Sequence, residues 1–351
     1  MFKLNDPFDQ INNDSLNKYK AAGGIATKAV GEIVNHAKVG TKLIDLQIIG
    51  NNYITKECAT LYKDISHKGL SFPICLSTNY IAGHYIPKET DILKEGDLLK
   101  IELGVHIDGF PALICFTTLI TENNQYDDKR KNVLKATIEA SREISGIMKP
   151  GKKNTEMIKI LEKYANKYNC NLPICNHAEN EIIPGIMTYQ ISRYVNDGYN
   201  NEEDEFIHQF MLVRDNKNYE FTMVEFEFEE NDVYAIDVMM CSGNGRLNGL
   251  DEENKIYKRN RTKRADLKLK MSREILGKIG KDCFPTVIDN DAKTKFGIKE
   301  CFEKGVVKKY PVVGEKEKEF IARIKFTIIV KDKPILICGR TADNELNKLK
   351  N

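Results

Sequence analysis

The sequence predicts an α+β fold in which a pair of helices precedes long antiparallel strands, and this arrangement occurs twice. Helical periodicity predicts helices from residue 15 to about 40 and over 43–62, before strand regions at 69–87 and 98–120. A second pair of helices is predicted at 128–151 and 154–170, before strands at 221–240 and 320–330. Blocks of helices followed by blocks of antiparallel strands are typical of α+β folds.

Single residues mark the ends of the predicted helices. Ser15 is a suitable N-cap for the first helix, and Gly40 fits its end. Pro150 and Gly151 stop the third helix, and Asn154 is a suitable cap for the fourth. In the strand at 221–240, phenylalanines and glutamates alternate, which predicts one apolar and one acidic face.

The segment KIELGVHIDGFPALICF, residues 100–116, predicts a β-hairpin that turns at Asp108-Gly109. Counting outward from this turn pairs Ile107 with Phe110 and Glu102 with Cys115. Partners across an antiparallel pair share a face. The same face should therefore carry the side chains of Glu102, Gly104, His106, Pro111, Leu113 and Cys115.

Three charged residues interrupt strands that are otherwise apolar: Glu102 in the hairpin, Asp237 in VYAIDVMM and Lys325 in IARIKFTII. Burying an unpaired charge is costly, so each of these side chains requires a partner. We therefore expect the three residues to meet, with Lys325 paired to Glu102 or to Asp237.

The composition of the 351 residues is that of a globular protein, with 41% hydrophobic and 30% charged residues. The nine cysteines form no CxxC pair and no zinc-like spacing, which indicates thiols in a reducing compartment. The N-terminus has no apolar core of a secretory signal, and no apolar run is long enough for a membrane span. We expect a cytoplasmic protein with no membrane partner, and nuclear or nucleolar access as a further expectation.

The net charge of only +2 hides two opposed blocks. Residues 202–232 contain eleven acidic residues against Arg214 and Lys217, and an acidic face of this kind repels phosphate. Residues 255–281 contain eleven basic residues against Asp266 and Glu274, which indicates a nucleic-acid-binding surface. The residues predicted to bind RNA are Lys255, Lys258, Arg259, Arg261, Lys263, Arg264, Lys268, Lys270 and Arg273.

Long ordered motifs give the sequence a family resemblance between about Lys18 and about Val330. KYKAAGGIA, SFPICLSTNYIAGHYIP, LKEGDLLKIELGVHIDGF, VYAIDV followed by SGNG, IYKRN and IARIKFT closely resemble the proliferation-associated (Erb-binding) proteins. These are a non-catalytic branch of the type-two methionine aminopeptidase family. The resemblance implies a pita-bread fold over 15–340, with a basic helical insert at about 255–313. A flexible arm at 1–14 and a short tail at 341–351 complete the expected organisation.

The resemblance also implies where the metal ligands of the active relatives fall. The two aspartates of the active enzymes correspond to Glu102 and Leu113, their histidine to Tyr189, and their two glutamates to Asp237 and Lys325. His84 corresponds to a histidine that contacts substrate in the active enzymes. Hard divalent cations require several oxygen or nitrogen ligands, so two carboxylates of altered length beside a lysine are a poor metal site. No bound metal, no cofactor and no catalytic residue is therefore expected.

The expected function is that of a pseudo-peptidase that binds ribosomes and structured RNA, with roles in translation, ribosome biogenesis or growth regulation. Two alternatives remain open at this point. One is an active metal-dependent methionine aminopeptidase with an altered site, and the other is an adaptor that binds protein partners through the empty cleft.

Overall fold

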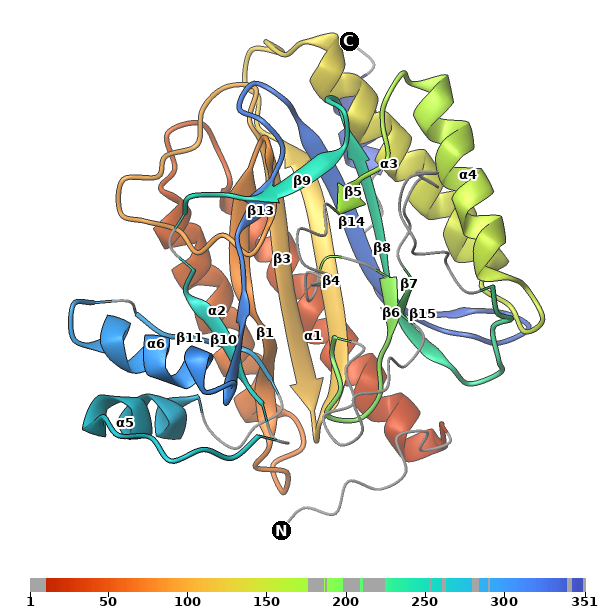
Figure 1. The fold of residues 1–351 in the computed structure, drawn as a ribbon. Coiled ribbons are helices and arrows are strands. Elements are labelled where there is room, and N and C mark those ends of the chain that lie inside the picture. The colour runs from red at the N-terminus through yellow and green to blue at the C-terminus, as the bar shows by residue number, and fades with distance from the viewer. Residues whose placement is uncertain are drawn as a thin grey trace.

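The computed structural model describes residues 11–175, 186, 188–197, 209–210, 225–252, 254–260, 263–279, 284–289, 291–339 and 343–349. Within these residues the main sheet has eight strands in the order β1-β3-β4-β14-β8-β6-β7, with β15 paired to β14 (Figure 1). Its paired neighbours are antiparallel. The bounds are β1 Lys68–Thr78, β3 Leu98–Ile107, β4 Phe110–Leu119, β6 Thr188–Gln190, β7 Gln209–Phe210, β8 Val233–Cys241, β14 Ile321–Ile329 and β15 Ile335–Cys338.

Two pairs of helices cover one face of the main sheet. Helix α1 packs on β3 and β4, and α2 packs on α1 and β1; α3 packs on β14 and β8, and α4 packs on α3. The helices are α1 Asn13–His36, α2 Leu43–Thr60, α3 Asp128–Ile147 and α4 Asn154–Lys167. The predicted α+β fold, with two helix pairs and two sets of antiparallel strands, is therefore confirmed.

The opposite face of the main sheet is partly covered by a small second sheet with the strand order β2-β13-β9-β5. Its strands are β2 Ile81–Gly83, β5 Ile174–Cys175, β9 Arg246–Gly249 and β13 Val313–Gly314. In Figure 1, β13, β9 and β5 lie in front of the central strands of the main sheet. The centre of the main sheet therefore lies between helices on one side and this second sheet on the other.

The hairpin of β3 and β4 has the predicted register along its whole length. Ile107 pairs with Phe110, Gly104 with Leu113 and Glu102 with Cys115. The two turn residues both have positive φ, 52° at Asp108 and 83° at Gly109. Positive φ at both central residues is the requirement of the tight hairpin turn that an Asp-Gly dipeptide favours.

The helix ends differ from the prediction at two N-caps. Helix α1 begins at Asn13 rather than Ser15, because Asn12 Oδ1 accepts from the Ser15 amide and Ser15 Oγ accepts from the Asn12 amide. This reciprocal pair satisfies two otherwise free amides and lengthens the helix by two residues. Helix α4 has Lys153 as its N-cap residue, and Asn154 is the first helical residue. Asn154 Oδ1 accepts instead from the amide of Phe226.

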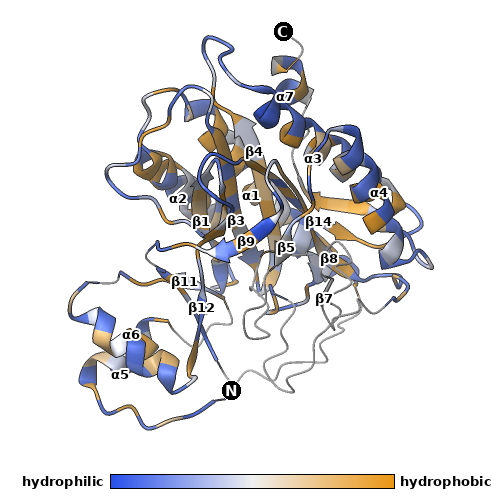
Figure 2. Cartoon of the chain, turned by 45° about the horizontal axis from the view of Figure 1, so that its top comes forward, coloured by the Kyte–Doolittle hydropathy of each residue, from blue (hydrophilic) through white to orange (hydrophobic). Residues whose placement is uncertain are grey.

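The described residues between 255 and 310 form a separate lobe, which we call the basic lobe. It contains a three-stranded sheet in the order β11-β10-β12 and two helices, α5 and α6. Figure 2 shows α5 and α6 set apart from the two sheets of the main body. The lobe has its own apolar core, which includes Tyr257, Ile275 and Ile298. Its elements are β10 Ile256–Arg259, α5 Lys270–Lys278, β11 Thr286–Val287, α6 Thr294–Glu303 and β12 Val307–Tyr310.

The insert expected to be helical at about 255–313 is therefore mixed in structure, since its helices are framed by short strands. The strands Ile256–Arg259 and Val307–Tyr310 pair with each other in antiparallel register. The limits of the insert as a domain stay a prediction.

Several other predictions concern the ends of the chain and the acidic block. Residues 202–208 and 211–224 of that block lie outside the described residues, as do 1–10 of the expected arm. From residue 225 the predicted alternation holds, with exposed Glu225, Glu227 and Glu229 and buried Phe228, although the regular strand begins only at Val233.

The expected tail contains α7, Asp343–Lys348, in which buried Glu345 accepts hydrogen bonds from Thr118 and Leu119.

Among the described helices, none combines the length and the apolar character that a membrane span requires.

Two adjacent glycines on α1 provide a test of how closely this helix packs. A Cβ at Gly23 would lie 2.1 Å from the carbonyl oxygen of Ile337 on β15, whereas a Cβ at Gly24 meets nothing within 4 Å. Gly23→Ala should lower the free energy of unfolding by about 1–3 kcal/mol, because β15 must move. Gly24→Ala should raise it by about 0.5–1 kcal/mol, because alanine favours a helix. Urea unfolding of both variants measures the difference, and an equal effect of the two substitutions would contradict this packing.

Candidate functional site

The three charged residues that interrupt the apolar strands lie in one row across the main sheet. The row runs over four adjacent strands and consists of Glu102 on β3, Cys115 on β4, Lys325 on β14 and Asp237 on β8. The side chain of each charged residue is at most 4% exposed. The expectation that the three residues meet is confirmed.

A fourth charged residue, Arg323, completes the cluster and was missed from the sequence. It lies two residues before Lys325 on β14, so both side chains project from the same face of the sheet. Arg323 Nη1 and Nη2 donate to the two oxygens of Glu102 at 2.7 and 2.8 Å. Arg323 Nε and Nη2 donate to the two oxygens of Asp237 at 2.8 and 2.6 Å. The guanidinium therefore holds both carboxylates with the paired geometry that arginine favours.

Lys325 binds the same two carboxylates from the neighbouring position. Its Nζ donates to Glu102 Oε1 at 2.7 Å and lies 3.4 Å from Asp237 Oδ2. It also donates to the hydroxyl of Tyr189 at 3.3 Å, and it lies 5.3 Å from the centroid of that ring. The lysine pairs with both acids, although the sequence predicted one or the other, and Tyr189 joins the site as the fifth member.

We call Glu102, Asp237, Arg323 and Lys325 the four-charge cluster. Two carboxylates and two cations give a net charge of zero, so the charges compensate one another in a buried site. Burial alone would raise the pKa of Glu102, but the charges of Arg323 and Lys325 outweigh it and lower this pKa to about 2. Burial acts to lower the pKa of Lys325, yet Glu102, Tyr189 and Asp237 raise it overall. Glu102, Arg323 and Lys325 therefore stay charged near neutral pH.

The cluster has room for the guanidinium because Gly83 on β2 has no side chain. A Cβ at Gly83 would lie 2.6 Å from Arg323 Nη1 and 3.3 Å from Glu102 Oε2. The same nitrogen lies 3.4 Å from the carbonyl oxygen of Ala82, to which it donates. Strand β2 thus closes the site on the side opposite the main sheet.

Two other predicted site residues, Leu113 and His84, lie beside the cluster, and both are uncharged. Leu113 shares the face of Glu102, two register pairs along the hairpin, and its buried side chain offers no ligand atom. His84 is buried, and its Nδ1 lies 2.8 Å from the carbonyl oxygen of Pro311, to which it must donate. Its Nε2 has no hydrogen-bond partner among the described residues. Burial lowers the pKa of His84 to about 4, so the imidazole is neutral at physiological pH.

Cys115 separates Glu102 from Lys325 in the row but is not a nucleophile. Burial raises the pKa of its thiol to about 12, so the reactive thiolate is rare near neutral pH. This argues against a cysteine hydrolase at the cluster.

The residues predicted to bind RNA lie in the basic lobe, with one correction. Lys258 is buried, and its Nζ donates to both oxygens of Asp197 at 2.8 Å, while the Tyr310 hydroxyl donates to Asp197 at 2.6 Å. This lysine joins the lobe to the main body and cannot contact a phosphate. The prediction failed because strand alternation turns Lys258 inward from a run of surface cations.

The remaining residues of that prediction are on or near the surface, except Arg261, which lies outside the described residues. Lys255 and Arg259 are partly exposed. The exposed residues of the prediction are Lys263, Arg264, Lys268, Lys270 and Arg273. Arg273 Nη1 also donates to the carbonyl oxygens of Leu267 and Lys268 at 2.5 and 3.2 Å.

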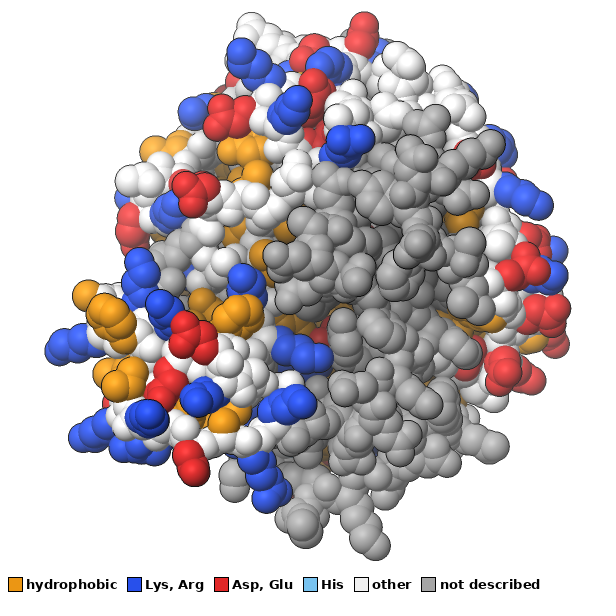
Figure 3. Space-filling view, in the orientation of Figure 1, with side chains coloured by type: hydrophobic (Ala, Val, Ile, Leu, Met, Phe, Trp, Pro, Cys, Tyr) orange, Lys and Arg blue, Asp and Glu red, His pale blue; other side chains and the backbone are white. Residues whose placement is uncertain are grey.

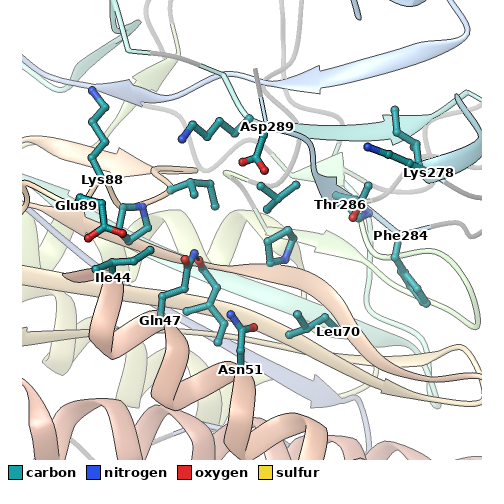
Figure 4. A pocket seen from close by; sticks show the side chains of 18 of the residues that line it. Ile44, Gln47, Asn51, Leu70, Lys88, Glu89, Lys278, Phe284, Thr286 and Asp289 are labelled. Carbon is teal, nitrogen blue, oxygen red and sulfur yellow. Dashed lines mark hydrogen bonds between the residues drawn. The ribbon is translucent and has the colours of Figure 1, made fainter. Parts of the chain in front are cut away.

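A cavity of about 710 Å³ lies between the basic lobe and the main body. Figure 4 shows Gln47 and Asn51 of α2 and Leu70 of β1 on one side, with Lys278 and Phe284 of the lobe across from them. No residue of the four-charge cluster lines this cavity. The ring of Phe284 also lies 4.5 Å from that of His106, a second contact that fixes the lobe on the main body.

The comparisons with known proteins place this architecture in a family. Residues 17–241 match the model of metallopeptidase family M24. ERBB-3 binding protein 1 of Arabidopsis thaliana is 33% identical over 326 residues, which are 90% of this chain and 77% of that protein. The curved DNA-binding protein of Schizosaccharomyces pombe is 29% identical over 347 residues, 95% of this chain and 85% of that protein. A solved structure of a thermophilic Arx1, 23% identical, superposes with a TM-score of 0.75 over 97% of this chain and 99% of that one.

The fold and the matched model define a protein with the pita-bread architecture of the M24 peptidases, as the sequence predicted. The chain belongs to metallopeptidase family M24, within the branch of the ERBB-3-binding and proliferation-associated proteins.

Membership of a metallopeptidase family implies bound divalent metals, and the residues of the cluster do not fit them. All four carboxylate oxygens of Glu102 and Asp237 already accept hydrogen bonds from Arg323 or Lys325. A divalent ion 4 Å from one of these cations would be repelled by roughly 8 kcal/mol at an effective dielectric constant of about 20. Among the described residues, no group of three or more His, Cys, Asp and Glu is arranged to hold a metal.

The four-charge cluster should stabilise the fold only while its two carboxylates and two cations are all present. Lys325→Met and Glu102→Gln should each lower the free energy of unfolding by about 3–5 kcal/mol, because each leaves an uncompensated buried charge. The double variant should lose less than the sum of the single losses, since Arg323 and Asp237 remain paired in it. Urea unfolding of the three variants measures this coupling. Strict additivity would mean that Glu102 and Lys325 do not stabilise each other.

Proposed function

We propose that this protein is a non-catalytic member of family M24 that binds structured RNA, in the ribosome or free, through its basic lobe. The single observation that carries the loss of catalysis is the four-charge cluster, in which Arg323 and Lys325 take up both carboxylates. A metallopeptidase needs a metal-activated water as nucleophile, and this cluster offers neither free metal ligands nor a net negative charge.

The charge and exposure of the basic lobe support the RNA-binding part of the proposal. Residues 255–310 contain 17 Lys and Arg against seven Asp and Glu, whereas the whole chain has a net charge of only +2. Figure 3 shows many blue Lys and Arg side chains on this part of the surface. Clustered cations bind the phosphate backbone, and double-stranded RNA is recognised mainly through shape and backbone contacts.

The names of two relatives refer to binding. The Schizosaccharomyces pombe relative is named for binding curved DNA, and the Arabidopsis thaliana relative for binding ERBB-3. We propose action in translation, ribosome biogenesis or growth regulation, in the cytoplasm and also in the nucleus or nucleolus.

A second candidate function is a protein-binding adaptor that binds its partner beside the cluster. The observation that favours it is the buried Nε2 of His84, which lacks a partner among the described residues and is free to accept a hydrogen bond. Pull-down with and without nuclease separates this function from RNA binding, because a direct protein partner survives the nuclease.

The purified protein should bind no metal at the cluster. After exposure to excess Co²⁺ or Mn²⁺ and desalting, elemental analysis should find far less than one metal per chain. Release of methionine from a methionyl peptide should be absent and should not respond to a chelator. Stoichiometric metal that Glu102→Gln removes, together with peptide hydrolysis, would establish the active aminopeptidase alternative instead.

Binding to ribosomes and to duplex RNA should depend on exposed cations of the lobe. The variant Lys263→Glu, Arg264→Glu, Lys268→Glu, Lys270→Glu should lose co-sedimentation with ribosomes, and wild-type binding should weaken steeply with salt because phosphate contacts release counterions. The matched control carries the same charge change on exposed lysines outside the lobe, at Lys28, Lys56, Lys63 and Lys333. Undiminished binding by the lobe variant, or equal loss in the control, would reject the lobe as the RNA site.

A further inference from the structure

Helix α6 of the basic lobe has one buried and one exposed face. Thr294, Gly297, Ile298 and Cys301 are buried, with the spacing of a single helical stripe. The helix packs closely on α5, since a Cβ at Gly297 would lie 2.7 Å from Ile275 Cδ1. The residues between these positions are therefore directed away from the lobe.

The outward face of α6 carries exposed aromatic side chains. Phe296 is 69% exposed and Phe302 is 40% exposed. Among the residues whose side chains the structure describes, no other phenylalanine is exposed, and Phe296 is the most exposed large hydrophobic residue. Neither ring is part of the buried core of the lobe. Full burial of a phenylalanine would contribute about 1.5–3 kcal/mol, so the exposure of Phe296 is not explained by folding.

Cations frame both rings. Lys293, Lys295 and Lys299 lie within three residues of Phe296 and are exposed. Lys309 Nζ on β12 lies 4.7 Å from the centroid of the Phe302 ring. In Figure 3, orange hydrophobic side chains lie among blue ones over the basic lobe. An apolar protein surface that covered Phe296 would also have to desolvate these lysines, which is costly without paired anions.

We infer that Phe296 is a stacking platform for an unpaired base of a bound RNA, with the neighbouring lysines on the phosphates at either side. The inference rests on the proposed function and adds the class of RNA, namely one with a bulged or otherwise unpaired nucleotide beside a duplex. Every base has a face that stacks on an aromatic ring, and unpaired bases in RNA are commonly held in this way. Such an RNA would contact both features, with its phosphates on the lysines and its unpaired base on the exposed ring.

The test compares two RNA probes, a blunt duplex with one bulged adenosine and the same duplex without the bulge. Phe296→Leu should weaken binding of the bulged duplex about tenfold and leave the paired duplex unchanged, because leucine is apolar but does not stack. Phe296→Trp should retain or strengthen binding of the bulged duplex. The dependence on salt should be the same in all three proteins, since no phosphate contact is removed. Leu336→Ala, at a residue 54% exposed on β15, is the control and should change neither affinity.

Failure of the inference is distinguishable from failure of the proposed function. Equal affinity of wild type and Phe296→Leu for the bulged duplex would overturn the inference and leave RNA binding intact. Absence of wild-type binding to both duplexes would overturn the proposed function and the inference together. Because Phe296 is outside the core, its variants should unfold at the urea concentration of the wild type.

Discussion

The compensation of four buried charges is the constraint on which the centre of this structure depends. Moving an ion from water into a protein interior costs several kcal/mol, and this cost is recovered only with close partners and satisfied hydrogen bonds. Glu102, Asp237, Arg323 and Lys325 come from three strands of the main sheet, so the register of those strands and the pairing of the charges depend on each other. A shift of one residue in any strand would turn a charge toward the helices.

The same centre joins the two halves of the M24 fold through side-chain charges. In the active relatives that the sequence resembles, metal ions compensate carboxylates between the two halves of the fold. In this chain Arg323 and Lys325 compensate them, and Arg323 reaches Glu102 of the first half and Asp237 of the second. The two halves therefore remain joined through their charges. The surface of the basic lobe is separated from this centre by its own apolar core.

The sequence predicted the parts of this arrangement that rest on local rules. The Asp108-Gly109 turn determines the hairpin register, and that register alone identifies the shared face of Glu102 and Leu113. Lys325 was recognised because a charge in an apolar strand needs a partner. Arg323 carries the same signal, two residues earlier on the same face, and was missed because the comparison with metal ligands drew attention to Lys325 alone. Lys258 was misassigned because composition does not say which cation of a basic run is turned inward to Asp197.

Gly83 and the four-charge cluster together determine how easily this site could become a metal site. A return to a metal-binding set would need carboxylates at Leu113 and Lys325 and the removal of Arg323, which is several separate substitutions. Each taken alone unbalances a buried charge, at a cost comparable to much of the 5–15 kcal/mol that stabilises a typical domain. Any residue larger than glycine at position 83 would in turn push the guanidinium out of place. If the metal site was lost as we propose, that loss is difficult to reverse, because each single substitution back passes through a protein that folds poorly.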